Sequence, residues 1–216
     1  MSVYNALKYN VSFANAGSLV LLTTNTISSG VASSSFTTKI DSTYSEYIFL
    51  FNNIHPATDS TQFQVNFSTD SGSNYNVTKT TTNFNAYHNE AGSSTILGYN
   101  GSWDLAQSTS AQPLTTNTGN DNDQSVSGYL HLFEPSSTTF VKHFISNVNT
   151  YSSDDYSVNL YVAGYGNTTS AIDAVQFTMA SGNIDSGTIQ MFGVVKWVHI
   201  QTLDTTIIYL AVQAVV

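Results

Sequence analysis

Seven short segments of the chain alternate apolar residues with polar or small ones. Each segment is rich in β-branched and aromatic residues, which favour strands. They are EYIFLFNN (46–53), TQFQVNFST (61–69), GYLHLFE (128–134), TFVKHFISNV (139–148), SVNLYVAGYG (157–166), AVQFTMA (174–180) and GTIQMFGV (187–194). A period of two sends successive side chains to opposite faces of a sheet. These segments are therefore predicted to be half-buried β-strands.

Residues that favour turns separate these strands. The turn segments are DSGSN (70–74), EPSST (134–138), SSDD (152–155) and SGNIDSG (181–187). Short strands joined by turns in this way predict an antiparallel sandwich or barrel. No window of 11 to 18 residues keeps a helical period. Residues 104–127 form a long polar segment of the kind that is often functional or mobile in a compact domain.

The last predicted hairpin places one aromatic side chain on its outer face. In the strand that follows the turn SGNIDSG, residues Ile189, Met191 and Gly193 are expected on one face, and Gln190 and Phe192 on the other. Phe192 is therefore a candidate for contact with another surface.

The two ends of the chain differ from its middle. Residues 1–35 are expected to hold an N-terminal arm or the first strands, residues 36–195 one β-sandwich domain, and residues 196–216 a C-terminal extension. The extension ends in an apolar, β-branched run that needs a partner edge or groove. It can add a strand to its own sheet, dock on a neighbouring subunit as an assembly arm, or be a recent addition to the domain. The candidate assembly contacts in it are Trp197, Ile207, Ile208 and Leu210.

Composition narrows the choice of partners. Charged residues make up 9% of the chain, against a usual share of about 25%, so the surface is expected to be rich in hydroxyl and amide groups. The net charge is −9, and all five basic residues are lysines. Nucleic-acid binding needs clustered cations and favours arginine, so it is not expected.

The chain lacks cysteine, which excludes a small disulfide-stapled domain. The early apolar run at 19–22 is too short for a signal peptide or a bilayer span. We therefore expect synthesis in the cytoplasm and no membrane insertion.

Several blocks of the sequence resemble one family. They are IDSTYSEYIFLFNNIHPATDSTQFQVNFSTDSGSNYNVTKTTT (40–82), GYLHLFEPSSTTFVKHFISNV (128–148) and AGYGNTTSAIDAVQFTMASGNIDSGTIQMFGV (163–194), with AYH (86–88) and DLAQST (104–109) between them. In this order they resemble virion-associated proteins of marine tailed phages. The resemblance implies a jelly-roll-like β-sandwich that serves as a structural or fibre component of the particle. In the family's pattern the chain ends shortly after the equivalent of Gly193, whereas this chain continues to residue 216.

Candidate metal and catalytic groups are few. His131 and His143 lie on consecutive predicted strands and could face each other, and His88 with Glu90 could supply ligands on one strand face. A zinc site needs three or four convergent ligands, so solvent-facing histidines are the simpler interpretation. The run NDND (120–123) lacks the spacing of a calcium-binding EF-hand loop. We predict no metal and no cofactor.

No catalytic motif is present. The chain has no G-x-S-x-G motif for a nucleophilic serine. Asp104, Glu134 and Asp155 could form a glycosidase pair only if the fold brought two of them together. The chain is therefore predicted not to be an enzyme.

Sugar binding is the main alternative to a purely structural role. Tyr87, Tyr99, Trp103 and Asp104, with the loop 118–123, offer aromatic faces for a sugar ring and polar groups for its hydroxyls. The simpler interpretation is that Tyr99 and Trp103 pack against the rim of the sandwich.

These observations lead to two expected functions. The first is a non-enzymatic component of a tailed-phage virion (a capsid decoration, head fibre or tail-fibre-associated protein) that assembles with itself, as a homotrimer by analogy, and with other virion proteins. The second is a receptor-binding fibre tip that recognises carbohydrate on the host surface.

Overall fold

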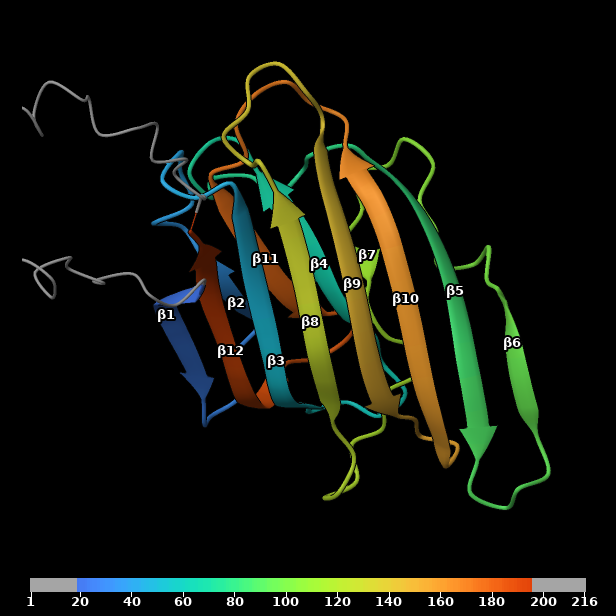
Figure 1. The fold of residues 1–216 in the computed structure, drawn as a ribbon. Coiled ribbons are helices and arrows are strands. Elements are labelled where there is room, and N and C mark those ends of the chain that lie inside the picture. The colour runs from blue at the N-terminus through green and yellow to red at the C-terminus, as the bar shows by residue number, and fades with distance from the viewer. Residues whose placement is uncertain (1–18, 196–216) are drawn as a thin grey trace, which may run out of the picture.

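The fold is a two-layer β-sandwich (Figure 1). A computed structural model describes residues 19–195, and all regular structure within them is β. The larger sheet consists, in spatial order, of β1 (Leu19–Ile27), β12 (Ile184–Val194), β3 (Glu46–Pro56), β8 (Val126–Phe133), β9 (Lys142–Tyr151), β10 (Tyr156–Gly166), β5 (Lys79–Asn89) and β6 (Thr95–Tyr99). The smaller sheet consists of β2 (Ser33–Phe36), β11 (Ala174–Met179), β4 (Phe63–Ser68) and β7 (Gln112–Pro113). The prediction of an all-β antiparallel sandwich is confirmed.

Eight of the strands are connected as a jelly roll. They form four nested pairs, β1 with β12, β2 with β11, β3 with β8 and β4 with β7, as if one long hairpin were rolled up. Successive pairs alternate between the two sheets, which gives the orders β1-β12-β3-β8 and β2-β11-β4-β7. This is the double-sheet arrangement of a jelly roll, as predicted.

Two inserted hairpins widen the larger sheet. Strands β5 and β6 come between β4 and β7 in the chain, and β9 and β10 come between β8 and β11. Together they extend the sheet beyond β8 in the order β9-β10-β5-β6. In Figure 1 this extension projects past the smaller sheet. Part of its inner face is therefore covered by loops rather than by strands.

The seven predicted strands are all present, within a few residues of their expected ends. The turn at 181–187 is shorter than predicted, because β12 already begins at Ile184. The pairing of β12 with β3 is irregular at two points, one on each side of Ser186. The expected faces of β12 are confirmed: Ile189 and Met191 are fully buried, whereas Gln190 and Phe192 are only half-buried on the other side. β5, β6 and β7 lie in segments for which no strand was predicted, whereas β1 and most of β2 lie in residues 1–35, where first strands were one of the two expectations.

Aromatic rings fill the centre of the sandwich. Phe177 of β11 lies within 6.2 Å, centroid to centroid, of four other phenylalanine rings, those of Phe36, Phe49, Phe51 and Phe63. Most of these pairs are edge-to-face, which adds about 0.5–1.5 kcal/mol per pair to the free energy of burial. The core is thus built from the alternate positions that the strand pattern singled out.

Two lysines are buried inside the sandwich. Lys79 and Lys142 begin β5 and β9, and both pair with Gly166 of β10. Nζ of Lys79 donates to Oδ1 of Asn66 and to the carbonyl oxygen of Val77, at 2.6 and 2.8 Å. Nζ of Lys142 donates to the carbonyl oxygens of Phe140 and Thr168, at 2.8 and 3.0 Å. Within residues 19–195, Lys39 is the only lysine left at the surface.

The first two strands belong to the sandwich and lie at its edges. β1 pairs with β12, with Leu19 opposite Val194, and β2 pairs with β11, with Phe36 opposite Val175. The described chain therefore begins and ends at the same edge of the larger sheet. None of residues 19–195 belongs to a helix that could cross a membrane.

Candidate functional site

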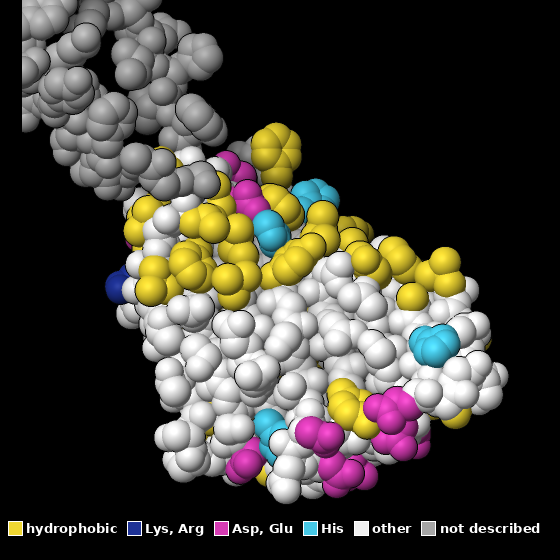
Figure 2. Space-filling view, turned by 60° about the horizontal axis from the view of Figure 1, so that its bottom comes forward, with side chains coloured by type: hydrophobic (Ala, Val, Ile, Leu, Met, Phe, Trp, Pro, Cys, Tyr) yellow, Lys and Arg dark blue, Asp and Glu magenta, His cyan; other side chains and the backbone are white. Residues whose placement is uncertain are grey.

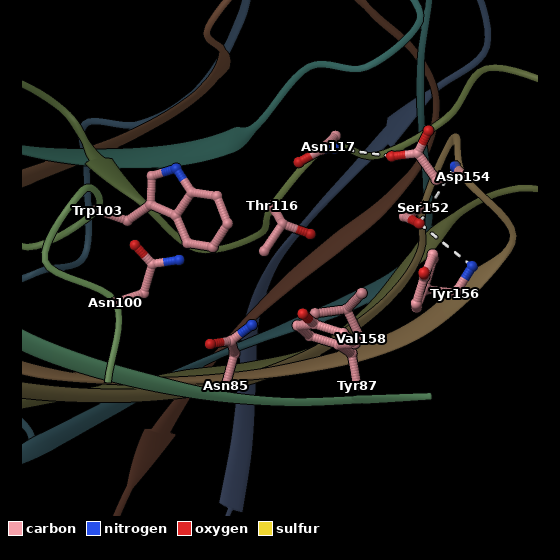
Figure 3. A pocket seen from close by; sticks show the side chains of 10 residues that line it. All are labelled: Asn85, Tyr87, Asn100, Trp103, Thr116, Asn117, Ser152, Asp154, Tyr156 and Val158. Atoms are coloured by element: carbon pink, nitrogen blue, oxygen red, sulfur yellow. Dashed lines mark hydrogen bonds between the residues drawn. The ribbon is translucent and has the colours of Figure 1, made fainter. Parts of the chain in front are cut away.

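A pocket lies under the extension of the larger sheet (Figure 3). Its volume is about 330 Å³. Strands β5 and β10 form one side, and the loop after β6, the loop after β7 and the turn between β9 and β10 form the others. The lining residues are Asn85, Tyr87, Asn100, Trp103, Thr116, Asn117, Ser152, Asp154, Tyr156 and Val158. We call this cavity the aromatic pocket.

Three aromatic side chains stand around the aromatic pocket. Trp103 lies on one side, and Tyr87 and Tyr156 lie on the other (Figure 3). The two tyrosine rings pack edge to face, with centroids 5.3 Å apart and planes at 88°. Trp103 is half-buried and also packs against the hydrophobic core. Packing against the sandwich therefore holds its ring in place beside the cavity.

Polar groups lie between these rings. Asn85 of β5 is 5% exposed and Thr116 is 4% exposed. Both side chains line the cavity, and Figure 3 draws no hydrogen bond from either of them to the other lining residues. Across the pocket, Nδ2 of Asn117 donates to Oδ2 of Asp154 at 3.2 Å. The cavity thus offers one amide and one hydroxyl beside an amide–carboxylate pair.

Backbone hydrogen bonds fix the loops that form the aromatic pocket. The amide of Ser153 donates to the carbonyl oxygen of Asn117 at 3.0 Å, which ties the β9–β10 turn to the loop after β7. On the other side, Nε2 of the buried Gln112 donates to the carbonyl oxygen of Trp103 at 2.8 Å. Because these contacts already hold the loops in place, the loops lose less conformational entropy when a ligand binds.

The outer face of the larger sheet has a second feature, a band of apolar side chains. One residue from each of the eight strands belongs to it: Leu21, Phe192, Ile48, Tyr129, Ile145, Tyr161, Phe84 and Tyr99. We call this band the apolar stripe. Figure 2 shows hydrophobic side chains gathered across this face, next to an area of polar ones.

Cross-strand neighbours connect the apolar side chains at each end of the apolar stripe. Leu21 lies opposite Phe192, which lies opposite Ile48. Farther along, the rings of Tyr161 and Phe84 stack with centroids 4.8 Å apart and planes at 9°. Leu21 is 51% exposed and Ile145 is 49% exposed, so much of the stripe faces solvent in the single chain.

One ionisable pair lies within the apolar stripe, because His131 lies opposite Ile48 on one side and opposite Ile145 on the other. Nδ1 of His131 contacts Oε1 of Glu46, and the ring of His131 packs edge to face on Tyr129 at 5.1 Å. The stripe is thus interrupted by one hydrogen-bonded pair near its middle.

The structure brings together only two of the four predicted sugar-binding residues. Tyr87 and Trp103 both line the aromatic pocket. Tyr99 lies opposite Phe84 and therefore on the outer face of the sheet, where its hydroxyl bonds to the carboxylate of Asp104. That hydrogen bond raises the pKa of the Tyr99 phenol. Tyr99 thus belongs to the apolar stripe, and Asp104 lies beside it.

Of the predicted assembly contacts, Phe192 lies in the apolar stripe, between Leu21 and Ile48. Trp197, Ile207, Ile208 and Leu210 lie outside the described residues.

The two histidine sites that the sequence analysis considered are not assembled in the described residues. His131 lies opposite Ile145 and His143 lies opposite Tyr165, so the two histidines are not cross-strand partners. Glu90, the expected partner of His88, instead accepts a hydrogen bond from the hydroxyl of Tyr151, which raises the pKa of Tyr151 to about 12. Within residues 19–195 no three His, Asp or Glu side chains lie close enough together to hold a metal ion.

The three acids considered for a glycosidase pair are spread over the molecule. Glu134 follows the end of β8 and Asp155 follows the end of β9, so the two lie at opposite ends of the sheet. Asp104 is bonded to Tyr99 on the outer side. The arrangement supplies no pair of carboxylates across a cleft.

Sequence reasoning missed most of the aromatic pocket. Asn85, Thr116 and Tyr156 come from three segments that are distant in the chain, and nothing in the local pattern marks any of them. The edge-to-face pair of Tyr87 and Tyr156 depends on the register of β5 with β10, where Tyr156 lies opposite Asn89. No protein-family model and no curated protein matches the chain.

Proposed function

We propose that the protein is a non-enzymatic structural component of a tailed-phage virion, where it acts by assembling with copies of itself. The apolar stripe is the observation that supports this proposal. It crosses all eight strands of the larger sheet, and several of its side chains are about half exposed. Contiguous apolar surface of this kind is characteristic of protein–protein contact sites.

A second copy of the chain is the partner that best fits the apolar stripe. The chain has a net charge of −9, so two copies repel each other over most of their surfaces. Along the stripe, two carboxylates occur among the described residues, and both are hydrogen-bonded, Glu46 to His131 and Asp104 to Tyr99. Association through this face would bury apolar side chains, at about 25 cal/mol per Å², where that repulsion is weakest.

The resemblance described above is the basis for the proposed location of the protein in the virion. The protein would be made in the host cytoplasm and join the virion beside other virion proteins as a capsid decoration, a head fibre or a tail-fibre-associated protein. A homotrimer is the assembly that the analogy favours. The jelly-roll sandwich is consistent with this role without specifying it, because one fold serves many functions.

Light scattering of the purified chain tests the assembly. We expect a stable oligomer whose mass falls to that of one chain in Leu21→Asn and Ile145→Asn. Phe140→Asn is the matched control, because Phe140 is 72% exposed but lies in the β8–β9 loop, away from the stripe. A single-chain mass for the unmodified protein would contradict the proposal.

Electron microscopy of intact virions tests the location. Gold-labelled antibody against the folded protein should bind to the particles. Label on the head would support a decoration or head fibre, and label on the tail a tail-fibre-associated protein. Unlabelled particles would contradict the assignment to the virion.

A further inference from the structure

We infer that the aromatic pocket binds a neutral pyranose unit of a glycan. This inference does not depend on the proposed assembly, because the pocket lies between β5, β10 and the loops that cover them, whereas the apolar stripe lies on the opposite face of the sheet. The two sites can be tested separately.

Two polar side chains of the aromatic pocket suit a ligand with hydroxyl groups. Asn85 and Thr116 both line the cavity and are 5% and 4% exposed. The amide of Asn85 and the hydroxyl of Thr116 can each donate and accept hydrogen bonds. A ligand with several hydroxyl groups can therefore bond to both.

The rings around the aromatic pocket suit a sugar. A pyranose has one face of C–H groups, which packs on an aromatic ring, and a rim of hydroxyls, which need donors and acceptors. Trp103 offers a ring on one side, and Tyr87 and Tyr156 form the opposite wall (Figure 3). The amide of Asn85 and the hydroxyl of Thr116 lie between them (Figure 3).

The size of the pocket limits the ligand. A volume of about 330 Å³ is at the lower end of the range for small-molecule sites, which is roughly 300–1,000 Å³. It therefore fits a single sugar unit, with the rest of a glycan chain extending into solvent.

The charge of the lining selects for neutral sugars. The lining contains one carboxylate, Asp154, and no lysine, arginine or histidine. Phosphate, sulfate and carboxylate groups are usually held by cations, so uronic acids, sulfated sugars and nucleotides lack a partner here. Asp154 and its bonded Asn117 instead offer acceptors and donors to sugar hydroxyls.

Tryptophan fluorescence provides a direct test. The chain has two tryptophans, Trp103 and Trp197, so Trp197→Phe leaves Trp103 as the only tryptophan reporter. Full-length protein with this change would be titrated with glucose, galactose, mannose and N-acetylglucosamine, and then with neutral and acidic oligosaccharides on an array. We expect a saturable change in Trp103 emission with at least one neutral sugar, and no binding of the acidic ones.

Two variants locate the binding, with one control. Asn85→Ala and Tyr156→Ala should each weaken binding by tenfold or more while the far-ultraviolet circular dichroism spectrum stays unchanged. Tyr99→Ala is the control, since Tyr99 is an exposed aromatic on the opposite face, and its affinity should equal that of the unmodified protein.

Three results would overturn the inference: no neutral sugar bound at millimolar concentration, binding of acidic glycans alone, or affinity unchanged in both pocket variants. Ile145→Asn separates this inference from the proposed assembly. If that variant is a single chain and still binds the monosaccharide, the pocket works without the oligomer. If the unmodified oligomer forms but binds none of the sugars, the pocket inference fails and the assembly stands.

Discussion

Lys79 donates a hydrogen bond to Oδ1 of Asn66 over 2.6 Å, and both side chains are buried inside the sandwich. Its other partner is the carbonyl oxygen of Val77, so no carboxylate balances the ammonium charge. Burial therefore lowers the pKa of Lys79 to about 8. Burial also lowers the pKa of Lys142, whose two partners are carbonyl oxygens.

Because the pKa values of these buried lysines are lowered, we predict that the protein becomes more stable as the pH rises above 8. The pKa of lysine in the unfolded chain is about 10.4. Between pH 8 and that value the unfolded chain binds more protons than the folded one, so the free energy of unfolding increases with pH. From pH 7 to 9.5 we expect Lys79 to add about 2 kcal/mol, at 1.36 kcal/mol per pKa unit.

Guanidinium unfolding at pH 7.0 and 9.5, at constant ionic strength, measures this change. Lys79→Met should show a smaller increase, with the remainder due to Lys142. An equal increase in Lys79→Met and in the unmodified protein would show that Lys79 stays protonated when buried.

Replacing Phe177 tests the aromatic core. Phe177→Ala removes the ring that packs against four other phenylalanines at the centre of the sandwich. We expect the free energy of unfolding to fall by about 3–5 kcal/mol, as for other large-to-small changes in cores. Phe140→Ala, at an exposed loop position, should change it by less than about 0.5 kcal/mol. Urea unfolding curves would compare the two, and equal losses would contradict the assigned core.

Gly187 should not tolerate a side chain. Its φ is +125°, and a Cβ there would lie 2.6 Å from the carbonyl oxygen of Asn53 and 2.8 Å from Cα of Ile54. Both the backbone angle and the close approach of β3 therefore oppose alanine. We expect Gly187→Ala to lower the free energy of unfolding by about 1–3 kcal/mol.

Gly98→Ala is the control for Gly187→Ala. Gly98 has an ordinary φ, and nothing lies within 4 Å of the position of its Cβ. Thermal unfolding of both variants would test the irregular pairing of β12 with β3, because equal melting temperatures would mean that β3 does not approach Gly187 closely.

Assembly through the apolar stripe should depend little on salt. Screening weakens interactions between exposed charges, and the stripe contains almost none. We expect the mass of the oligomer to stay the same between roughly 0.05 and 1 M sodium chloride. Over this range the Debye length shortens by a factor of about three or more. Cooling weakens hydrophobic association, so dissociation should increase at low temperature. Sedimentation velocity can follow both, and dissociation by salt would contradict an apolar interface.

The strands of the core could be predicted because they follow one rule, apolar inside and polar outside. β3 is the clearest case, with Tyr47, Phe49 and Phe51 buried at alternate positions. β5 reverses the rule: Thr81, Asn83 and Asn85 point inward and are buried, whereas Phe84 points outward and is 46% exposed. A pattern search that assigns polar residues to the surface therefore does not identify β5, whose sequence is KTTTNFNAYHN, as a strand of the sandwich.

The reversal in β5 has a physical cause. Its inner face meets polar loops instead of the apolar side of the smaller sheet. The hydroxyl of Thr81, for example, accepts a hydrogen bond from the amide of Leu105, in the loop after β6, at 2.8 Å. The candidate site was missed for the same reason, because its polar groups lie on this inward face and only the fold brings Trp103 and Thr116 over it. Residue type directed attention to Trp103 and Tyr87, which line the pocket, and equally to Tyr99, which lies on the other face.

The nested pairing of the strands also determines when the protein can fold during synthesis. β1 must wait for β12, since the first strand of the jelly roll pairs with the last and every other pair is enclosed between them. Until residues 184–194 have left the ribosome, β3 lacks one of its two neighbours and the phenylalanines of the core have no complete cover. Unpaired strand edges and apolar side chains of the core therefore stay exposed until β12 has been synthesised, and only then can the sandwich be completed.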